Sequence, residues 1–492
     1  MVARYEVVAS VLDDVESSPK CEGRSSRRCI LAATVLIAAS SSGAVCHKDG
    51  GTPTAVLTGV INDSSSWPTL ELSYSPYGVA QGAVRSSVAT HDLEIGKGTD
   101  WFGAIADVAS LGSGRVAVVD KLEKKITIFD SLGNRTARFG REGRGPGEYR
   151  WPWAMTVVGE NLVVWQNTPS STFTVLAPDG KVIATGSRTV EGDWIRPGFR
   201  FPLLNLELEQ MGPEDVTRRL DAFGDSGFVH QLQIDEQVQI RSGGPRDFPA
   251  PPVYLIRYDL SATVRDTIAI MVGPPTLRYR REFRGVLPFY EQPLFSGRPV
   301  WATGEGWIAL GHGDSTRVVV RGFQGDTSLI ITWPESRHDV TEADKINASK
   351  WILAIRIMNR PESLTIYEGI SPGEREHAVD NTAFNLTPFA KVAPTVTAAY
   401  GYRKCLFLSG FSSEDWVDGT SSTWIVINVD KKTIEGVIRI PESDSAGLKF
   451  DRHGVLVRDF DDRFVFTVAR DRDGVFLLRR YRLPGIDCSR RS

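Results

Sequence analysis

Short apolar runs with the two-residue alternation of β-strands recur along this chain, and polar turns separate them. Four such runs fall within each repeat of about 40 to 50 residues. One segment departs from this pattern and has helical spacing instead. These three observations predict an all-β fold: a six-bladed β-propeller of four-stranded antiparallel blades, with one inserted amphipathic helix.

The first repeat shows the pattern most clearly. Residues 115–120 (RVAVVD) and 125–130 (KITIFD) have the composition of two strands, and the polar turn 121–124 joins them. Residues 135–139 follow a second turn as another strand, and the glycine-rich stretch 140–152 closes the repeat. Strands and turns at this spacing are typical of an antiparallel meander.

The same pattern predicts six blades. A single four-stranded sheet cannot bury both of its apolar faces, whereas radial stacking lets each blade cover its neighbours. The sixth unit lacks an outer strand of its own, and we expect residues 91–96 (HDLEIG) to supply it and close the ring. A pair of packed sheets is the alternative architecture. The six units span residues 101–149, 150–196, 197–275, 297–340, 390–442 and 446–484.

The inserted helix is predicted at about residues 341–359, between two blades. Thr341 followed by Asp344 is a start signal, and Pro361 is a stop signal. Such a helix either packs on the rim of the propeller or docks a partner.

The N-terminal 46 residues are predicted to be a signal peptide. The apolar run 30–39 (ILAATVLIAA) follows three arginines and precedes the small residues 40–44. A run of about ten apolar residues is too short to span a bilayer. A buried apolar helix is the alternative interpretation.

Cys46 is a candidate lipidation site. It follows Gly43, Ala44 and Val45, which resembles a bacterial lipobox, although Val45 and Gly43 depart from the usual residues of that motif. Cleavage after Ala44 by an ordinary signal peptidase is the alternative. Residues 47–90 are rich in Ser, Gly, Thr and Pro and are expected to form a flexible tether or an N-terminal arm. The protein is therefore expected to be exported to the periplasm or outer envelope, either lipid-anchored or without an anchor.

Residues 115–152 resemble an NHL-type propeller blade. Three further stretches resemble uncharacterised bacterial exported proteins with six-bladed propellers: 299–326 (PVWATGEGWIALGHGDSTRVVVRGFQGD), 339–345 (DVTEADK) and 475–485 (VFLLRRYRLPG). The resemblance covers residues 91–484 and leaves 485–492 as a C-terminal tail. It implies a fold rather than a function, because propellers serve as binders, lyases, hydrolases and scaffolds alike.

Charge and metal-binding patterns exclude some functions. The chain has 57 Lys and Arg against 60 Asp and Glu, and without a basic run it is not expected to bind nucleic acid. Its 7 histidines are scattered, and neither HExxH nor CxxC occurs. No metal ligand can be named, although a propeller channel can gather ligands from distant blades. Cys405 and Cys488 either pair in an oxidising compartment or remain buried thiols.

Four short motifs have a structural and a chemical interpretation. Residues 224–227 (GDSG) match a serine-protease signature but lack its context, so a polar turn is expected. The glycines of 140–147 lack the GK[ST] of a phosphate loop and are expected to form a blade crossover. Residues 471–474 (DRDG) lack the distal ligands of a calcium loop. Trp151, Trp153 and Trp301 either line a ligand platform or pack between blades.

No catalytic or cofactor-binding residue is therefore predicted. The leading hypothesis is an exported, non-enzymatic, monomeric propeller that binds a peptide, protein or glycan and touches the membrane only through a lipid anchor. The alternative is a metal-dependent lactonase or lyase with a divalent ion in the central channel. A structural module of an envelope complex is a third possibility.

Overall fold

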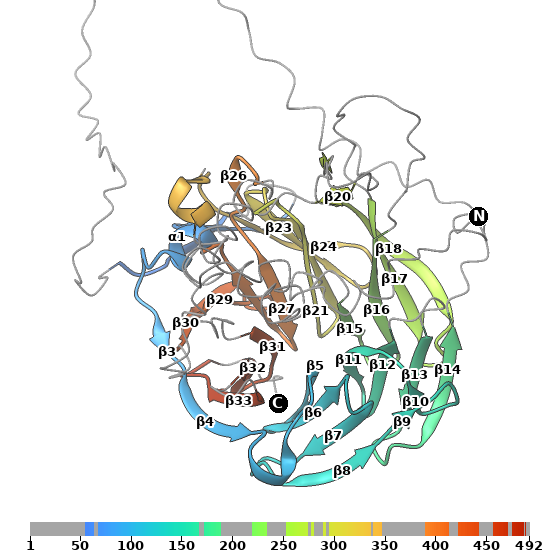
Figure 1. The fold of residues 1–492 in the computed structure, drawn as a ribbon. Helices are drawn as coiled ribbons and strands as arrows, with labels where there is room; N and C mark the ends of the chain where they lie inside the picture. The colour runs from blue at the N-terminus through green and yellow to red at the C-terminus, as the bar shows by residue number, and fades with distance from the viewer. Residues whose placement is uncertain are drawn as a thin grey trace, which may run out of the picture. The chain divides into compact units, whose positions relative to one another are not determined.

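The computed structural model shows six antiparallel four-stranded sheets that form the blades of a propeller ring (Figure 1). The predicted all-β, six-bladed fold is thus confirmed. The residues that the structure describes are 55–62, 67–166, 172–187, 219–233, 252–273, 277–279, 289–291, 295–335, 338–346, 389–412, 422–441, 456–470, 475–486 and 488.

Blades 1 to 3 each begin with their inner strand. Blade 1 consists of β5 (Ile105–Gly112), β6 (Arg115–Asp120), β7 (Lys125–Phe129) and β8 (Arg135–Phe139). Blade 2 consists of β11 (Pro152–Val158), β12 (Asn161–Gln166), β13 (Thr172–Leu176) and β14 (Val182–Ser187). Blade 3 consists of β15 (Leu220–Phe223), β16 (Gly227–Gln233), β17 (Pro252–Asp259) and β18 (Val264–Val272).

Blades 4 to 6 follow the same order. Blade 4 consists of β21 (Pro299–Gly304), β22 (Trp307–His312), β23 (Arg317–Gly322) and β24 (Thr327–Thr332). Blade 5 consists of β27 (Ala398–Tyr402), β28 (Cys405–Ser409), β29 (Ser422–Asn428) and β30 (Thr433–Ile440). Blade 6 consists of β31 (Leu456–Phe460), β32 (Phe464–Arg470) and β33 (Phe476–Arg482), with β4 (Thr90–Ile95) as its outer strand.

The ring closes in two ways. Each inner strand contacts the next, and β31 of blade 6 returns to β5 of blade 1. At the outer edge of blade 6, β33 pairs antiparallel with β4, where Arg480 lies opposite Leu93. This pairing confirms the expectation that residues near 91–96 complete the last blade.

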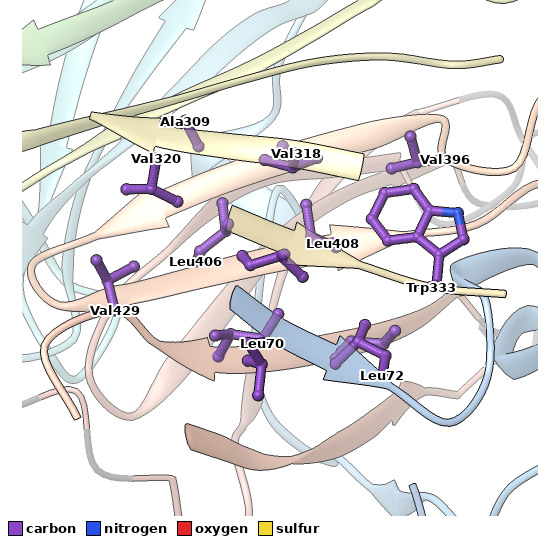
Figure 2. Close-up of a cluster of buried hydrophobic side chains, with 14 of the residues drawn as sticks. Leu70, Leu72, Ala309, Val318, Val320, Trp333, Val396, Leu406, Leu408 and Val429 are labelled. Carbon is purple, nitrogen blue, oxygen red and sulfur yellow. The ribbon is translucent and has the colours of Figure 1, made fainter. Parts of the chain in front are cut away.

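Hydrophobic cores fill the interfaces between neighbouring blades. In β6, Val116 and Val118 pack toward blade 6, whereas Ala117 and Val119 pack toward blade 2. Both faces of the strand are therefore buried, which explains the nearly continuous apolar run of residues 115–120. Figure 2 shows the core between blades 4 and 5, where side chains such as Val318 and Leu406 meet.

The segment before β4 packs against the propeller as an N-terminal arm, defined here as the described residues of 55–89. It contains β1 (Gly59–Asn62), β2 (Thr69–Leu72), α1 (Pro76–Ala80) and β3 (Ser87–Val88). Strand β2 pairs parallel with β24 of blade 4, and β3 pairs parallel with β30 of blade 5. Leu70 and Leu72 of β2 enter the core between these two blades (Figure 2). The arm therefore lies on the propeller and does not hang free as a tether.

A disulfide holds the C-terminal tail against blade 5. Cys405 of β28 is bonded to Cys488, with their Cα atoms 5.4 Å apart. Of the two alternatives that the sequence left open for these cysteines, the structure shows the pair.

The inserted helix begins where the sequence predicts. Residues 342–346 are helical, and Thr341 Oγ1 accepts a 3.2 Å hydrogen bond from the Asp344 amide while the Thr341 amide donates to Asp344 Oδ2 at 2.8 Å. This reciprocal arrangement is a capping box. Residues 347–359 lie outside the described residues. Within the described part of the chain, no helix has the length and apolarity to cross a membrane.

Short elements connect the blades. They are the 3-10 helix η3 (Gly98–Asp100), β9 (Arg141–Glu142), β10 (Glu148–Tyr149), β19 (Leu277–Tyr279), β20 (Phe289–Glu291), β25 (His338–Asp339) and β26 (Val392–Ala393).

Candidate functional site: a charged cluster on the inner strands

The inner strands carry charged residues that interrupt their apolar pattern. We call five of them, together with one tyrosine, the axial cluster. It consists of Asp107 of β5, Arg219 and Asp221 at the start of β15, Tyr400 of β27, and Arg458 and Asp459 of β31. Blades 1, 3, 5 and 6 therefore each contribute to one group of interacting side chains.

Arg219 links three blades within this cluster. Its Nε donates to Asp221 Oδ1 at 2.9 Å, and its Nη2 lies 2.9 Å from Asp221 Oδ2 as the second contact of the ion pair. Its Nη1 donates to the carbonyl of Trp301 at 3.3 Å and to that of Ala399. The guanidinium lies over the ring of Tyr400, with Cζ 4.1 Å from the ring centroid. Arg219 is thus fully engaged in a bidentate ion pair, two carbonyl contacts and a cation–π contact.

Three aspartates in the cluster bind the backbone of the neighbouring blade. Asp107 Oδ2 accepts a 2.8 Å hydrogen bond from the Met155 amide in blade 2. Asp459 Oδ2 accepts a 2.7 Å bond from the Ser110 amide in blade 1. Asp221 accepts bonds from the backbone and hydroxyl of Thr303 in blade 4. Part of their role is therefore structural, because each carboxyl joins two inner strands.

Burial changes the acidity of these carboxyls. It raises the pKa of Asp107 to about 6, although Arg458 and the amide of Met155 act in the opposite direction. Burial also raises the pKa of Asp459 to about 7, against the amides of Ser110 and Phe460. The pKa of Asp221 is raised by burial in spite of its pairing with Arg219. Carboxyls that titrate near neutral pH can accept or donate hydrogen bonds and exchange protons.

Tyr400 interacts with both guanidiniums of the cluster. Its hydroxyl donates to the Val457 carbonyl at 3.0 Å. Burial raises the pKa of Tyr400, and Arg219 and Arg458 oppose that rise. The phenol therefore stays protonated and holds β27 against β31.

Arg458 differs from Arg219. Its Nε is excluded from solvent and makes no hydrogen bond within the described residues. The charge of Arg458 opposes the rise in the pKa of Asp107 and of Tyr400, so its guanidinium lies close to both groups. The cluster thus contains one guanidinium with a carboxylate partner and one that, among the described residues, forms no ion pair.

The three tryptophans that the sequence offered as a platform have different surroundings, and the Trp301 ring lies against Arg219 of this cluster, with Cζ 5.5 Å from the ring centroid. Trp301 is buried, and its Nε1 donates to Gln231 Oε1 at 2.6 Å. Lys124 Nζ lies 4.2 Å from the ring centroid of Trp151, and Lys121 Nζ lies 5.3 Å from that of Trp153. For Trp301, packing between blades is therefore the correct interpretation.

The GDSG motif forms a hairpin turn. Gly224 has φ +65°, and Ser226 is exposed between β15 and β16. The glycine-rich stretch forms the crossover from blade 1 to blade 2, where Glu148 accepts from the Arg144 and Gly145 amides at 3.0 and 2.8 Å. Both motifs have the structural role that the sequence favoured.

Metal-ligating side chains do not gather in the described part of the chain. No group of three or more His, Cys, Asp or Glu side chains there is placed to hold a metal ion. His230 lies among the core aromatics Trp165 and Phe173, with ring centroids 4.9 and 5.3 Å away. Residues 471–474 and Cys46 lie outside the described residues.

No sequence motif marks the axial cluster. Its residues come from four blades and have no fixed spacing, so no linear pattern joins them. The usable signal was charge inside an apolar strand, as with Asp107 in IADVAS and the adjacent Arg458 and Asp459 in LVRDF. A buried charge is costly unless it is paired, so such positions indicate a special environment.

Comparison with known proteins gives similarity in shape and no family. The sequence matches no protein-family model and no curated protein. A member of the DUF4221 family from Bacteroides vulgatus has a TM-score of 0.41 and 11% identity, covering 80% of this chain and 97% of its own. A protein of unknown function from Bacteroides caccae has a TM-score of 0.32 and 9% identity, covering 80% and 97%.

A streptogramin B lyase has a TM-score of 0.32 and 9% identity, covering 80% of this chain and 98% of its own. Similarity at this level assigns neither a family nor an activity. The NHL-type resemblance of residues 115–152 therefore stays a prediction, and the chain is interpreted through its own geometry.

Proposed function

We propose that this chain is an exported propeller module that binds a peptide, protein or glycan at the axial cluster. The observation that carries the proposal is the convergence of two guanidiniums, three carboxyls and a phenol from four blades. A site with donors, acceptors and both signs of charge can recognise amides, chain termini and sugar hydroxyls. The inner strands that hold it are fixed by the cores between the blades, so the site is rigid.

We further propose that the protein acts in the periplasm or outer envelope, as a member of the NHL-like exported propellers. The basic and apolar residues of 24–44 support export, and Cys46 is the proposed lipidation site. The Cys405–Cys488 disulfide also supports an oxidising compartment, where such bonds persist. The proposed module is monomeric, binds no nucleic acid and needs no resident cofactor.

The test is a binding screen of the full chain, purified with its disulfide intact, on arrays of bacterial glycans and peptides. A ligand of the axial cluster should bind the wild type and lose at least tenfold in affinity in Asp107→Asn. The matched control is Asp225→Asn, which changes an exposed carboxyl in the turn between β15 and β16. Ligands that bind both variants equally, or no ligand at all, would contradict the proposal.

A further inference from the structure

Arg219 and Asp221 form an ion pair within the axial cluster. A hydrogen bond from Arg219 Nε to Asp221 Oδ1 and an ion-pair contact from Nη2 to Oδ2, each at 2.9 Å, join the two groups. Such fork-to-fork pairing is the preferred geometry between a guanidinium and a carboxylate, and it is stronger than a bond between neutral groups.

Arg458 carries the same guanidinium group, but among the described residues it has no carboxylate partner. Its Nε is shielded from solvent and has no acceptor among the described residues. A guanidinium donor that stays unpaired in the interior lowers stability, because desolvation is not offset by a hydrogen bond. A ligand that supplies an acceptor for Arg458 would remove that cost. Such a ligand would therefore bind more tightly.

None of the neighbours of Arg458 among the described residues supplies that acceptor. Asp107 is close enough for Arg458 to lower its pKa, yet Oδ2 of Asp107 accepts from the amide of Met155 instead. Asp221 is held by Arg219, and the phenol of Tyr400 donates to the Val457 carbonyl. Among the described residues, Arg458 therefore forms no ion pair.

We propose that Arg458 binds a carboxylate of the ligand, in a bidentate pair that mirrors Arg219 and Asp221. This inference rests on the proposed function, and it narrows the ligand to one that carries a carboxylate. Sugar acids and the C-terminus of a peptide offer the same group. The experiment below distinguishes these two sources.

The test uses four small probes on the full chain. D-Glucuronate and N-acetyl-L-alanine carry the carboxylate, and methyl α-D-glucoside and N-acetyl-L-alaninamide are their neutral counterparts. Binding is followed by titration and by the arginine Nε–Hε resonances, with Arg458 assigned from its loss in Arg458→Lys. One acid should bind at least tenfold more tightly than its neutral counterpart and should shift the Arg458 resonance.

Variants separate a direct contact from a structural effect. Arg458→Gln should lower the affinity for that acid at least tenfold, with an unfolding midpoint no lower than that of the wild type, and Arg458→Lys should lower the affinity less. Arg115→Gln, at an exposed position of β6, is the matched control and should bind as the wild type does. Should Arg458→Gln fail to fold, Arg458→Lys and the resonance shift decide the question.

Two results would overturn the inference. One is equal binding of an acid and its neutral counterpart; the other is wild-type affinity in a folded Arg458 variant. Binding of an array ligand that depends on Asp107 but not on Arg458 would leave the proposed function standing and remove this inference alone. A total absence of binding in both experiments would remove both.

Discussion

The Asp459 carboxyl, on the last inner strand, accepts the amide hydrogen of Ser110, on the first, with 2.7 Å between Oδ2 and N. The same carboxyl also accepts from the amide of Phe460 at 2.8 Å. The inner side of the ring is thus joined between blade 6 and blade 1 by an ionisable group whose pKa burial raises to about 7.

Asp459→Asn should change the pH dependence of stability in a defined direction. A raised pKa in the folded state means that folding favours the protonated carboxyl, so its contribution is full below about pH 4 and is lost as the pH rises through about 7. Asparagine cannot ionise and lacks this loss. Relative to the wild type, the variant should gain about 1 to 3 kcal/mol in unfolding free energy between pH 4.5 and 7.5.

Urea unfolding at several pH values measures that difference. The control is Asp130→Asn, because the side chain and amide of Asn134 hold the pKa of Asp130 below its usual value and outside this range. The difference between this control and the wild type should stay constant with pH. A constant difference for Asp459→Asn as well would contradict the assigned pKa.

Removal of the disulfide should destabilise the protein. Cys405 and Cys488 are 83 residues apart in the sequence, so their bond restricts a long loop in the unfolded chain. Replacement of both by alanine should lower the unfolding free energy by about 2 to 4 kcal/mol. A reducing agent should lower the unfolding free energy of the wild type, measured with urea, by a similar amount. It should leave the unfolding free energy of the double variant unchanged. A wild type that is insensitive to the reducing agent would refute this prediction.

Asp92→Ala should loosen the outer closure of the ring. Asp92 of β4 accepts from Arg480 Nε at 2.7 Å, and the same guanidinium donates to the carbonyls of Gly114 and Ser131 at 2.6 and 2.9 Å. Loss of the carboxylate leaves the charge of the buried Arg480 without its partner, at a cost of about 3 kcal/mol.

Thermal unfolding compares this change with Lys97→Ala, which removes the exposed Lys97–Glu94 pair. An exposed pair contributes about 1 kcal/mol or less. Similar losses in the two variants would show that the Asp92–Arg480 pair has no special role in closing the ring.

Gly401→Ala should disturb the contact between blades 4 and 5. A Cβ atom on Gly401 of β27 would collide with the backbone carbonyl of Thr303 in β21. Because a backbone atom cannot rotate away, the substitution should cost about 1 to 3 kcal/mol. A Cβ atom on Gly436 of β30 would meet only open space. Gly436→Ala is therefore the control and should change the melting temperature little. Equal melting temperatures for the two variants would contradict the predicted clash.

Much of the fold could be predicted because each blade is local in sequence. Residues 115–139 contain three successive strands and their turns, so alternation and turn residues were enough to define them. The last outer strand was predictable for another reason: blade 6 lacked one, and residues 91–96 had the right pattern. The positions of β2 and β3 could not be predicted, because these short strands pair with strands more than 240 residues further along the sequence.

The candidate site could not be predicted in the same way. Asp107 and Arg458 interact across most of the chain, and only the closure of the ring brings their strands together. The sequence drew attention instead to local motifs, and GDSG and the glycine-rich stretch proved to be turns and a crossover. Trp301 was a reasonable candidate by position, but its side chain serves the core.

The arm and β4 also determine the order in which this chain can finish folding. Blades 4, 5 and 6 each take a strand from residues 69–95, which are synthesised long before those blades exist. The early residues must therefore wait, unpaired, until the last strands arrive, and contacts this distant in sequence form slowly. Blades 1 and 2 can assemble on their own strands meanwhile, so the chain becomes complete only when its two ends meet.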